Sequence, residues 1–175
     1  MIVKITNAAR IKDYLSVLGN TVSIVSGYDE KFASDDPKTC IVMKAMKAGK
    51  GFIIEDTTLT VNGTTYNSSV KRCDLTGHER AEWTTKISYH SGSIIHFYKA
   101  SLSGRISGLF SDSSESLKFG EIFIPDGYDV NIHEIEKKGD TDFKNARQLA
   151  LTKLLLGESY HVEMLEPIRP KRSQS

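Results

Sequence analysis

The chain has 175 residues, about the length of one domain, and a chain of that size buries on the order of 70% of its unfolded surface when it folds. Hydrophobic residues make up 39% and charged residues 26%, which excludes a disordered chain, and 23 Lys plus Arg against 22 Asp plus Glu argue against general nucleic-acid binding. Two cysteines are too few for a disulfide scaffold, and no apolar run approaches the roughly 18 residues of a membrane span, so we expect a cytoplasmic protein without a membrane segment.

The first third of the chain alternates predicted strands and helices. Apolar residues at helical spacing predict a helix that ends at Gly19, and Asp36-Pro37 resembles an N-cap followed by proline, which predicts a second helix through about Ala48. Around these helices, short runs of mostly apolar residues predict three strands, at Ile2–Ile5, Val22–Val25 and Phe52–Ile54. This order is typical of an α/β unit in which some strands pair in parallel.

In the rest of the chain, the predicted elements are consecutive strands followed by one helix. The strongest hairpin signal in the sequence comes from two predicted strands, Trp83–Tyr89 and Ile94–Ala100, joined across Ser91-Gly92. Short strands are predicted at Arg105–Leu109 and Ile122–Ile124, and a helix is predicted over Phe143–Leu156. We therefore predict one α/β domain over residues 1–166 with a mixed, twisted sheet, flanking helices and two lobes around a central cleft. A basic, flexible tail is expected over 167–175.

Two adjacent carboxylates, Glu55 and Asp56, directly follow the predicted strand Phe52–Ile54. Open α/β sheets bind ligands at the carboxyl ends of their strands, and paired carboxylates there can hold Mg²⁺, which prefers oxygen ligands. The alternative is a strand that simply leaves the sheet in a polar turn.

Two basic segments precede or begin predicted helices. The turn from Thr6 and Asn7 to Arg10 leads from a strand into a helix, where backbone N–H groups, the helix dipole and a cation suit a phosphate chain. Lys144 and Arg147 are three residues apart and share one face at the start of the last helix, so they are either functional or part of a solvated face.

Four motifs in order resemble the inosine triphosphate pyrophosphatase family, the non-canonical purine NTP pyrophosphatases or Ham1-like proteins. The family's opening T-G-N-A-x-K turn corresponds to Thr6–Arg10, without the glycine and with Arg for Lys. Its E-D-[ST]-x-L motif corresponds to Glu55–Leu59, S-G-R-I to Ser103–Ile106, and F-x-P-x-G-Y to Phe123–Tyr128. The resemblance covers most of the chain.

The resemblance implies a reaction in which water attacks the α-phosphorus of a purine nucleoside triphosphate with Mg²⁺, releasing the monophosphate and pyrophosphate. It implies that Asp56 orients or activates the water and that Glu55 assists, both as metal ligands. It assigns substrate binding to Thr6, Asn7, Arg10, Lys44, Phe119 and Arg147. It also implies a homodimer, for which the aromatic residues of the hairpin, Trp83, Tyr89, Phe97 and Tyr98, would supply surface.

The departures from the family pattern leave an alternative open. Thr39 stands where the family has a helix-borne Glu, with Asp35 or Asp36 as candidate replacements, and Ala146 stands where it has a His. The aromatic-Asp pair that helps bind the base is missing after Phe119-Gly120. These losses suit a degenerate member that binds or sequesters a nucleotide without hydrolysis, or an interaction protein that kept only the fold. The short form suits a phage-encoded protein in the host cytoplasm.

Overall fold

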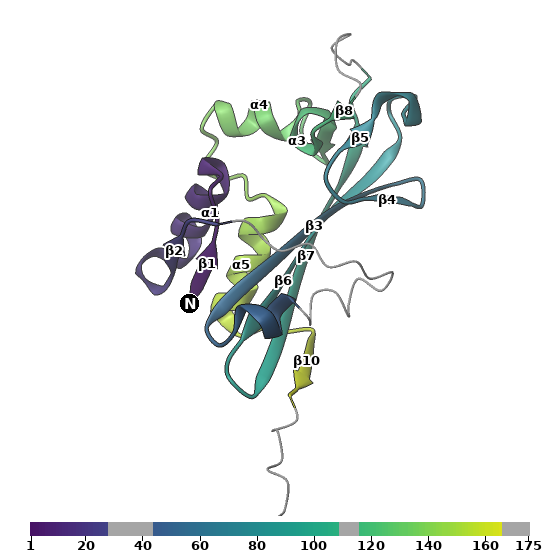
Figure 1. The fold of residues 1–175 in the computed structure, drawn as a ribbon. Helices are drawn as coiled ribbons and strands as arrows, with labels where there is room; N and C mark the ends of the chain where they lie inside the picture. Colours follow the sequence, from purple (N-terminus) through teal and green to yellow (C-terminus); the bar gives the residue numbers. More distant parts are fainter. Residues whose placement is uncertain (28–43, 109–115, 166–175) are drawn as a thin grey trace, which may run out of the picture.

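The computed structural model describes residues 1–27, 44–108 and 116–165 (Figure 1). Its main sheet contains β1 (Ile2–Lys4), β2 (Ser23–Val25), β3 (Phe52–Val61), β4 (Thr64–Tyr66), β6 (Arg80–His90), β7 (Ile94–Ile106), β9 (Phe123–Pro125) and β10 (His161–Met164). A small second sheet pairs β5 (Val70–Lys71) with β8 (Ser116–Leu117). The helices are α1 (Ala8–Leu18), α3 (Phe119–Ile122), α4 (Ile132–Lys137) and α5 (Ala146–Leu156), with short 3₁₀ turns η1 (Gly19–Thr21) and η2 (Arg72–Asp74). Residues 44–48 are also helical.

The main sheet is mixed, as predicted. Its strand order is β10-β7-β6-β3-β1-β2, with β4 paired to β3 and β9 paired to β7. β1 runs parallel to both β2 and β3, whereas the pairings of β3 with β6, β6 with β7 and β7 with β10 are antiparallel. The predicted parallel unit and the predicted hairpin therefore meet at β3 and form one sheet.

Three predicted boundaries need correction. β3 does not end at Ile54 but continues to Val61, so Glu55 and Asp56 lie inside a strand and not after its carboxyl end. The separate strand predicted from Arg105 is instead the end of β7, which runs to Ile106. The last helix begins at Ala146, behind the N-cap Asn145, and not at Phe143. The segment that opens the helix predicted from Asp36 lies outside the described residues.

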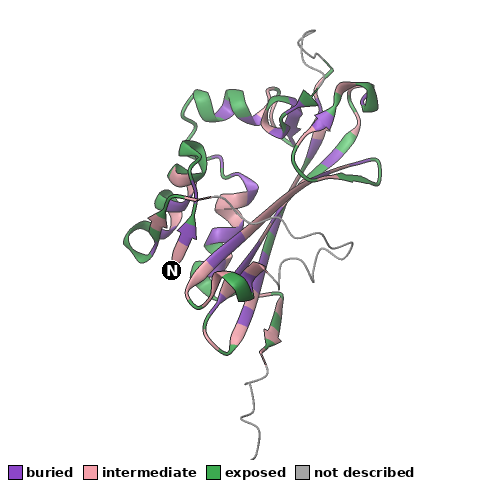
Figure 2. Cartoon of the chain, viewed as in Figure 1, coloured by how far each residue is buried: buried purple, intermediate pink, exposed green. Residues whose placement is uncertain are grey.

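Two larger hydrophobic cores lie at opposite ends of the long strands, and a smaller third cluster contains Ala45, Ile54, Ile95 and Phe97. One joins the residues of α1 and α5 to one face of the sheet; among its fully buried members are Tyr14, Ile53 and Leu151. The other lies under α3, α4 and β9 and contains Leu59, Phe123 and Ile135. Figure 2 shows buried segments near both ends of β3, with intermediate residues between them, and largely exposed residues on α4. The strands β3, β6 and β7 therefore connect two lobes.

The aromatic residues of the hairpin pack inside the protein. Phe97 and Tyr98 are 2% and 5% exposed, and Trp83 and Tyr89 are half-buried against the two cores. The argument that these rings supply a dimer surface is therefore wrong for Phe97 and Tyr98, which the sheet's own cores bury. Trp83 and Tyr89 stay partly exposed. The homodimer itself stays a prediction from the family resemblance. Within the described residues, no helix is long and apolar enough to cross a membrane.

Candidate functional site

A cleft of about 220 Å³ lies between the two lobes. One wall comes from α1 and from the start of α5, the other from α3 and α4, and Trp83 and Thr85 of β6 also line it. The charges in its lining are mixed: Arg10, Lys118 and Arg147 face Asp13, Glu121 and Glu136, and His133 is also present. The predicted cleft between two lobes is thus present, but it is not a purely cationic one.

The start of α1 supplies Asn7 and Arg10 to the cleft. The side chain of Asn7 caps the helix, because its Oδ1 accepts hydrogen bonds from the backbone N–H groups of Ala9 (3.0 Å) and Arg10 (3.2 Å). Two of the donors expected to hold a phosphate chain are therefore already used within the helix. A phosphate at this turn would have to displace the Asn7 side chain or bind to the Arg10 side chain.

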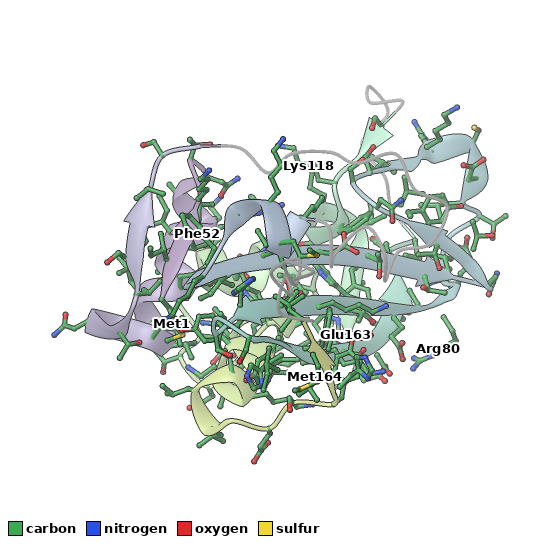
Figure 3. All side chains as sticks on the ribbon, turned by 60° about the horizontal axis from the view of Figure 1, so that its bottom comes forward. Met1, Phe52, Arg80, Lys118, Glu163 and Met164 are labelled. Carbon is green, nitrogen blue, oxygen red and sulfur yellow. The ribbon has the colours of Figure 1, made fainter. Side chains whose placement is uncertain are left out.

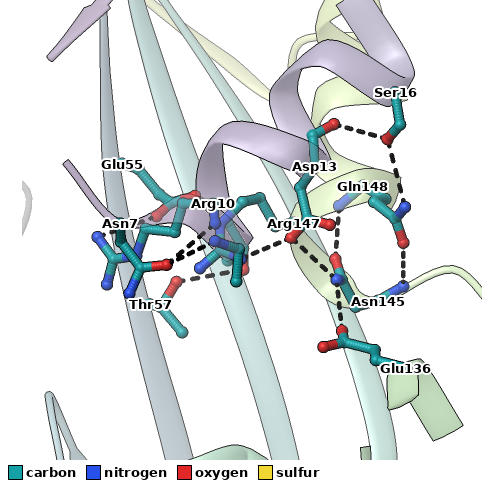
Figure 4. Close-up of polar contacts among 12 residues, drawn as sticks. Asn7, Arg10, Asp13, Ser16, Glu55, Thr57, Glu136, Asn145, Arg147 and Gln148 are labelled. Atoms are coloured by element: carbon teal, nitrogen blue, oxygen red, sulfur yellow. Dashed lines mark hydrogen bonds and ion pairs between the residues drawn. The ribbon is translucent and has the colours of Figure 1, made fainter. Parts of the chain in front are cut away.

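Arg147 lies at the centre of a buried ion-pair cluster (Figure 4). Its Nε donates to Oε1 of Glu55 from β3, and its Nη1 donates to Oδ2 of Asp13 from α1 at 2.8 Å. The side chains of Arg147, Glu55 and Asp13 are only 13%, 6% and 13% exposed. Burial alone would lower the pKa of Arg147, but the charges and hydrogen bonds of Glu55 and Asp13 outweigh it and raise the pKa above its usual value. The cluster joins α1, α5 and β3.

Arg10 shares the same carboxylate from the other side. Its Nη1 lies 3.6 Å from Oε2 of Glu55, and its side chain is 45% exposed. Glu55 is therefore held by two arginines, one buried and one at the surface of the cleft.

Asn145 connects this cluster to the second lobe. Its Nδ2 donates to Oδ2 of Asp13 (3.1 Å) and to Oε1 of Glu136 on α4 (3.0 Å). Its Oδ1 accepts from the backbone N–H of Gln148, whose side chain accepts from the backbone N–H of Asn145, a complete capping box. One buried amide thus caps α5 and links α1 to α4 across the cleft.

The other predicted site residues lie elsewhere. Successive residues of a strand point to opposite faces, so Asp56, next to Glu55 and opposite Lys86 in β6, faces away from the cleft. Lys44 begins the helical residues 44–48, whose Ala45 packs on Ile54, a residue of the same sheet face as Asp56. The structure therefore does not bring Asp56 and Lys44 together with the two arginines.

Two further predicted substrate contacts are not part of the described cleft lining. Thr6 is exposed between β1 and α1, outside the cavity that Asn7 and Arg10 line. Phe119 is 6% exposed and packs edge-on against Trp83 in the core of the second lobe. Its neighbours Lys118 and Gly120 line the cleft instead.

The pair Glu55 and Asp56 does not fit a Mg²⁺ ion. The two carboxylates lie on opposite faces of β3, and both oxygens of Glu55 face arginines in a buried position. In the parts of the chain that the structure describes, no three His, Cys, Asp or Glu side chains gather in a way that could hold a metal ion. Thr39, Asp35 and Asp36 lie outside the described residues.

Asp13, Asn145 and Glu136 are the site residues that the sequence did not suggest. Asp13 lies one helical turn after Arg10, which places both on one face of α1 and was a usable signal. Asn145 and Gln148 have the spacing of a capping box, a second signal in the sequence. The contact of Asn145 with Glu136 depends on how α4 packs, and no local sequence pattern predicts it.

Solved structures of Ham1 proteins share this fold. No protein-family model matches the chain, and no curated protein is similar to it in sequence. A Ham1 protein from Coxiella burnetii aligns with a TM-score of 0.61 at 11% identity, and the Staphylococcus aureus Ham1 protein aligns at 0.57 and 17%; each alignment covers 90% of this chain and 98% of the other. A nucleoside-triphosphatase, or dITP/XTP pyrophosphatase, from Mycobacterium abscessus aligns at 0.51 and 16%, over 90% and 96%. The expected Ham1-like α/β fold is confirmed.

Proposed function

We propose that this chain, which has the fold of the Ham1 proteins, is a nucleoside triphosphate pyrophosphatase that acts on purine nucleotides, including non-canonical or modified ones. The observation that carries the proposal is the cleft between the lobes, in which Asn7, Arg10 and Arg147 come from the segments that resemble the family's nucleotide-binding motifs. Arginine suits phosphate because its planar guanidinium offers several donors in a fixed geometry.

The reaction is the attack of water on the α-phosphorus. The new bond forms between the water oxygen and phosphorus, the bond to the oxygen bridging the α- and β-phosphates breaks, and pyrophosphate leaves with that oxygen while the water gives up a proton. Such a transfer depends mainly on positioning and on charge stabilisation. Arg10, half exposed at the cleft, can bind the phosphate chain with donors that Glu55 does not use.

The requirement for Mg²⁺ and the role of Asp56 both stay predictions of the family resemblance. The described residues around Glu55 do not fit the ion, so we assign no step to it. Asp56 faces the opposite side of the sheet from the cleft, so its assignment as the residue that activates water depends on the motif and not on the geometry.

The test is a screen for pyrophosphate release over canonical, deaminated and modified nucleoside triphosphates, with Mg²⁺ and with EDTA. We expect activity on at least one purine triphosphate and a loss of about 10²-fold or more in Asp56→Asn, since this change removes a base. Asp129→Asn is the matched control, because Asp129 is exposed and outside the described cleft lining. Tight nucleotide binding without any product would instead support a binding protein that has lost catalysis.

A further inference from the structure

The two arginines of the cleft differ in exposure and in how fully their guanidinium groups are paired with carboxylates. Arg147 is 13% exposed and donates to two carboxylates, Glu55 and Asp13. Arg10 is 45% exposed, and its ion pair with Glu55 is longer, at 3.6 Å. A guanidinium has five N–H donors, so Arg10 keeps most of its donors for a ligand.

Glu55 couples the two arginines. Its Oε1 accepts from Arg147 and its Oε2 faces Arg10, and its side chain is only 6% exposed. A carboxylate so far from water needs a partner to stay charged. Without Arg147, the nearest described cation of Glu55 would be Arg10, which would then turn its donors from the cleft to the carboxylate.

We propose that Arg10 is the residue that contacts the anionic part of the ligand, and that Arg147 is a positioning residue that neutralises Glu55 and so leaves Arg10 available. This division differs from the family resemblance, which assigns substrate binding to both arginines. It rests on the proposed function only for the kind of anion, a chain of phosphates. It also makes Glu55 part of the support of Arg10 and not a ligand of a metal ion.

The experiment measures the binding of inorganic tripolyphosphate by calorimetry in EDTA, at low salt and without turnover. Arg10→Gln should weaken binding by about tenfold or more, the value of one lost charge-assisted hydrogen bond. Lys12→Gln, which removes an exposed cation of α1 outside the described cleft lining, is the matched control and should weaken it far less.

The role of Arg147 as a positioning residue is tested by a double-mutant cycle with Glu55. If Arg147 acts through Glu55, Arg147→Gln should weaken binding about tenfold when Glu55 is present and less than about twofold in the Glu55→Gln background. An equal loss in both backgrounds would mean that Arg147 contacts the anion directly, and would overturn the proposal. Arg147→Lys serves in the same cycle if Arg147→Gln does not fold, since a compact ammonium cannot reproduce the fork that pairs with both carboxylates.

This outcome is separate from that of the proposed function. A protein that binds tripolyphosphate through Arg10 but hydrolyses no nucleotide refutes the proposed function and supports the division between the arginines. A wild-type protein that binds no tripolyphosphate refutes the assignment of Arg10. Hydrolysis combined with equal losses in the two Glu55 backgrounds supports the function and refutes the division.

Discussion

Arg147→Gln should destabilise the folded protein strongly. The change leaves Glu55 and Asp13, which are 6% and 13% exposed, without the guanidinium that they share. Removing one partner from a buried ion pair costs about 3 to 5 kcal/mol, because the other charge stays buried without its partner. At roughly 2 to 4 °C per kcal/mol for a chain of this size, the midpoint of thermal unfolding should fall by about 6 to 20 °C. Circular dichroism and calorimetry measure this midpoint.

Two matched variants decide whether burial is the cause. Arg80 makes two hydrogen bonds to Asp126, at 2.8 and 2.9 Å, but the side chains of this pair are 65% and 52% exposed, and Figure 3 shows Arg80 at the edge of the molecule. Arg80→Gln should therefore leave the midpoint nearly unchanged. Adding Glu55→Gln to Arg147→Gln should recover part of the loss, since no buried charge then remains at residue 55. Equal shifts for the two arginine variants, or no recovery, would refute the reasoning.

Gly104→Ala should lower the midpoint of thermal unfolding by several degrees, because the new Cβ would lie 2.2 Å from a carbonyl oxygen of β9 and overpacking costs about 1 to 3 kcal/mol. Gly120→Ala is the control, since its new Cβ would have its nearest atom at 3.9 Å. Equal midpoints for the two variants would contradict this prediction. Asn145→Ala should lower the free energy of unfolding by at least about 1 kcal/mol, the contribution of an N-cap, as measured by urea unfolding. A smaller loss would mean that the contacts of Asn145 with α1 and α4 are weak. Arg80 holds the pKa of Asp126 below its ordinary value, so the small stabilisation by this exposed pair is present above that value and is lost as the pH falls. Arg80→Gln should raise the pKa of Asp126 toward its ordinary value, as measured by NMR titration of the carboxyl carbon, and an unchanged pKa would contradict the assignment.

The sequence predicted the order of the main elements because their local signals were strong. The hairpin of β6 and β7 and the helix α1 have clear periodicity, and they are present nearly where they were predicted. α4, with six residues, and β10, with four, are too short for periodicity to identify. α4 forms because Ile132 and Ile135 are buried in the second core, and β10 forms because it pairs with β7.

The site was harder to predict because it depends on contacts between distant segments. The apolar run Phe52–Ile54 suggested a strand that ends before Glu55, but the threonines that follow favour a strand too, and β3 continues through them. Glu55 and Asp56 are consecutive residues of β3 and therefore lie on opposite faces of the sheet, so their adjacency in sequence was misleading. The pairing of Arg147 with Asp13 spans 134 residues and could not be predicted from spacing.

The long strands that pass through both lobes also determine how the cleft can move. No flexible linker joins the lobes along β3, β6 and β7; the same hydrogen-bonded ladder runs from one core to the other. A change in cleft width along these strands must bend or twist the ladder. The sheet therefore resists opening and closing elastically and favours one cleft width, unlike two lobes joined by a hinge. For the same reason we expect amide hydrogen exchange to protect the centres of these strands together, and the two cores to melt in one transition.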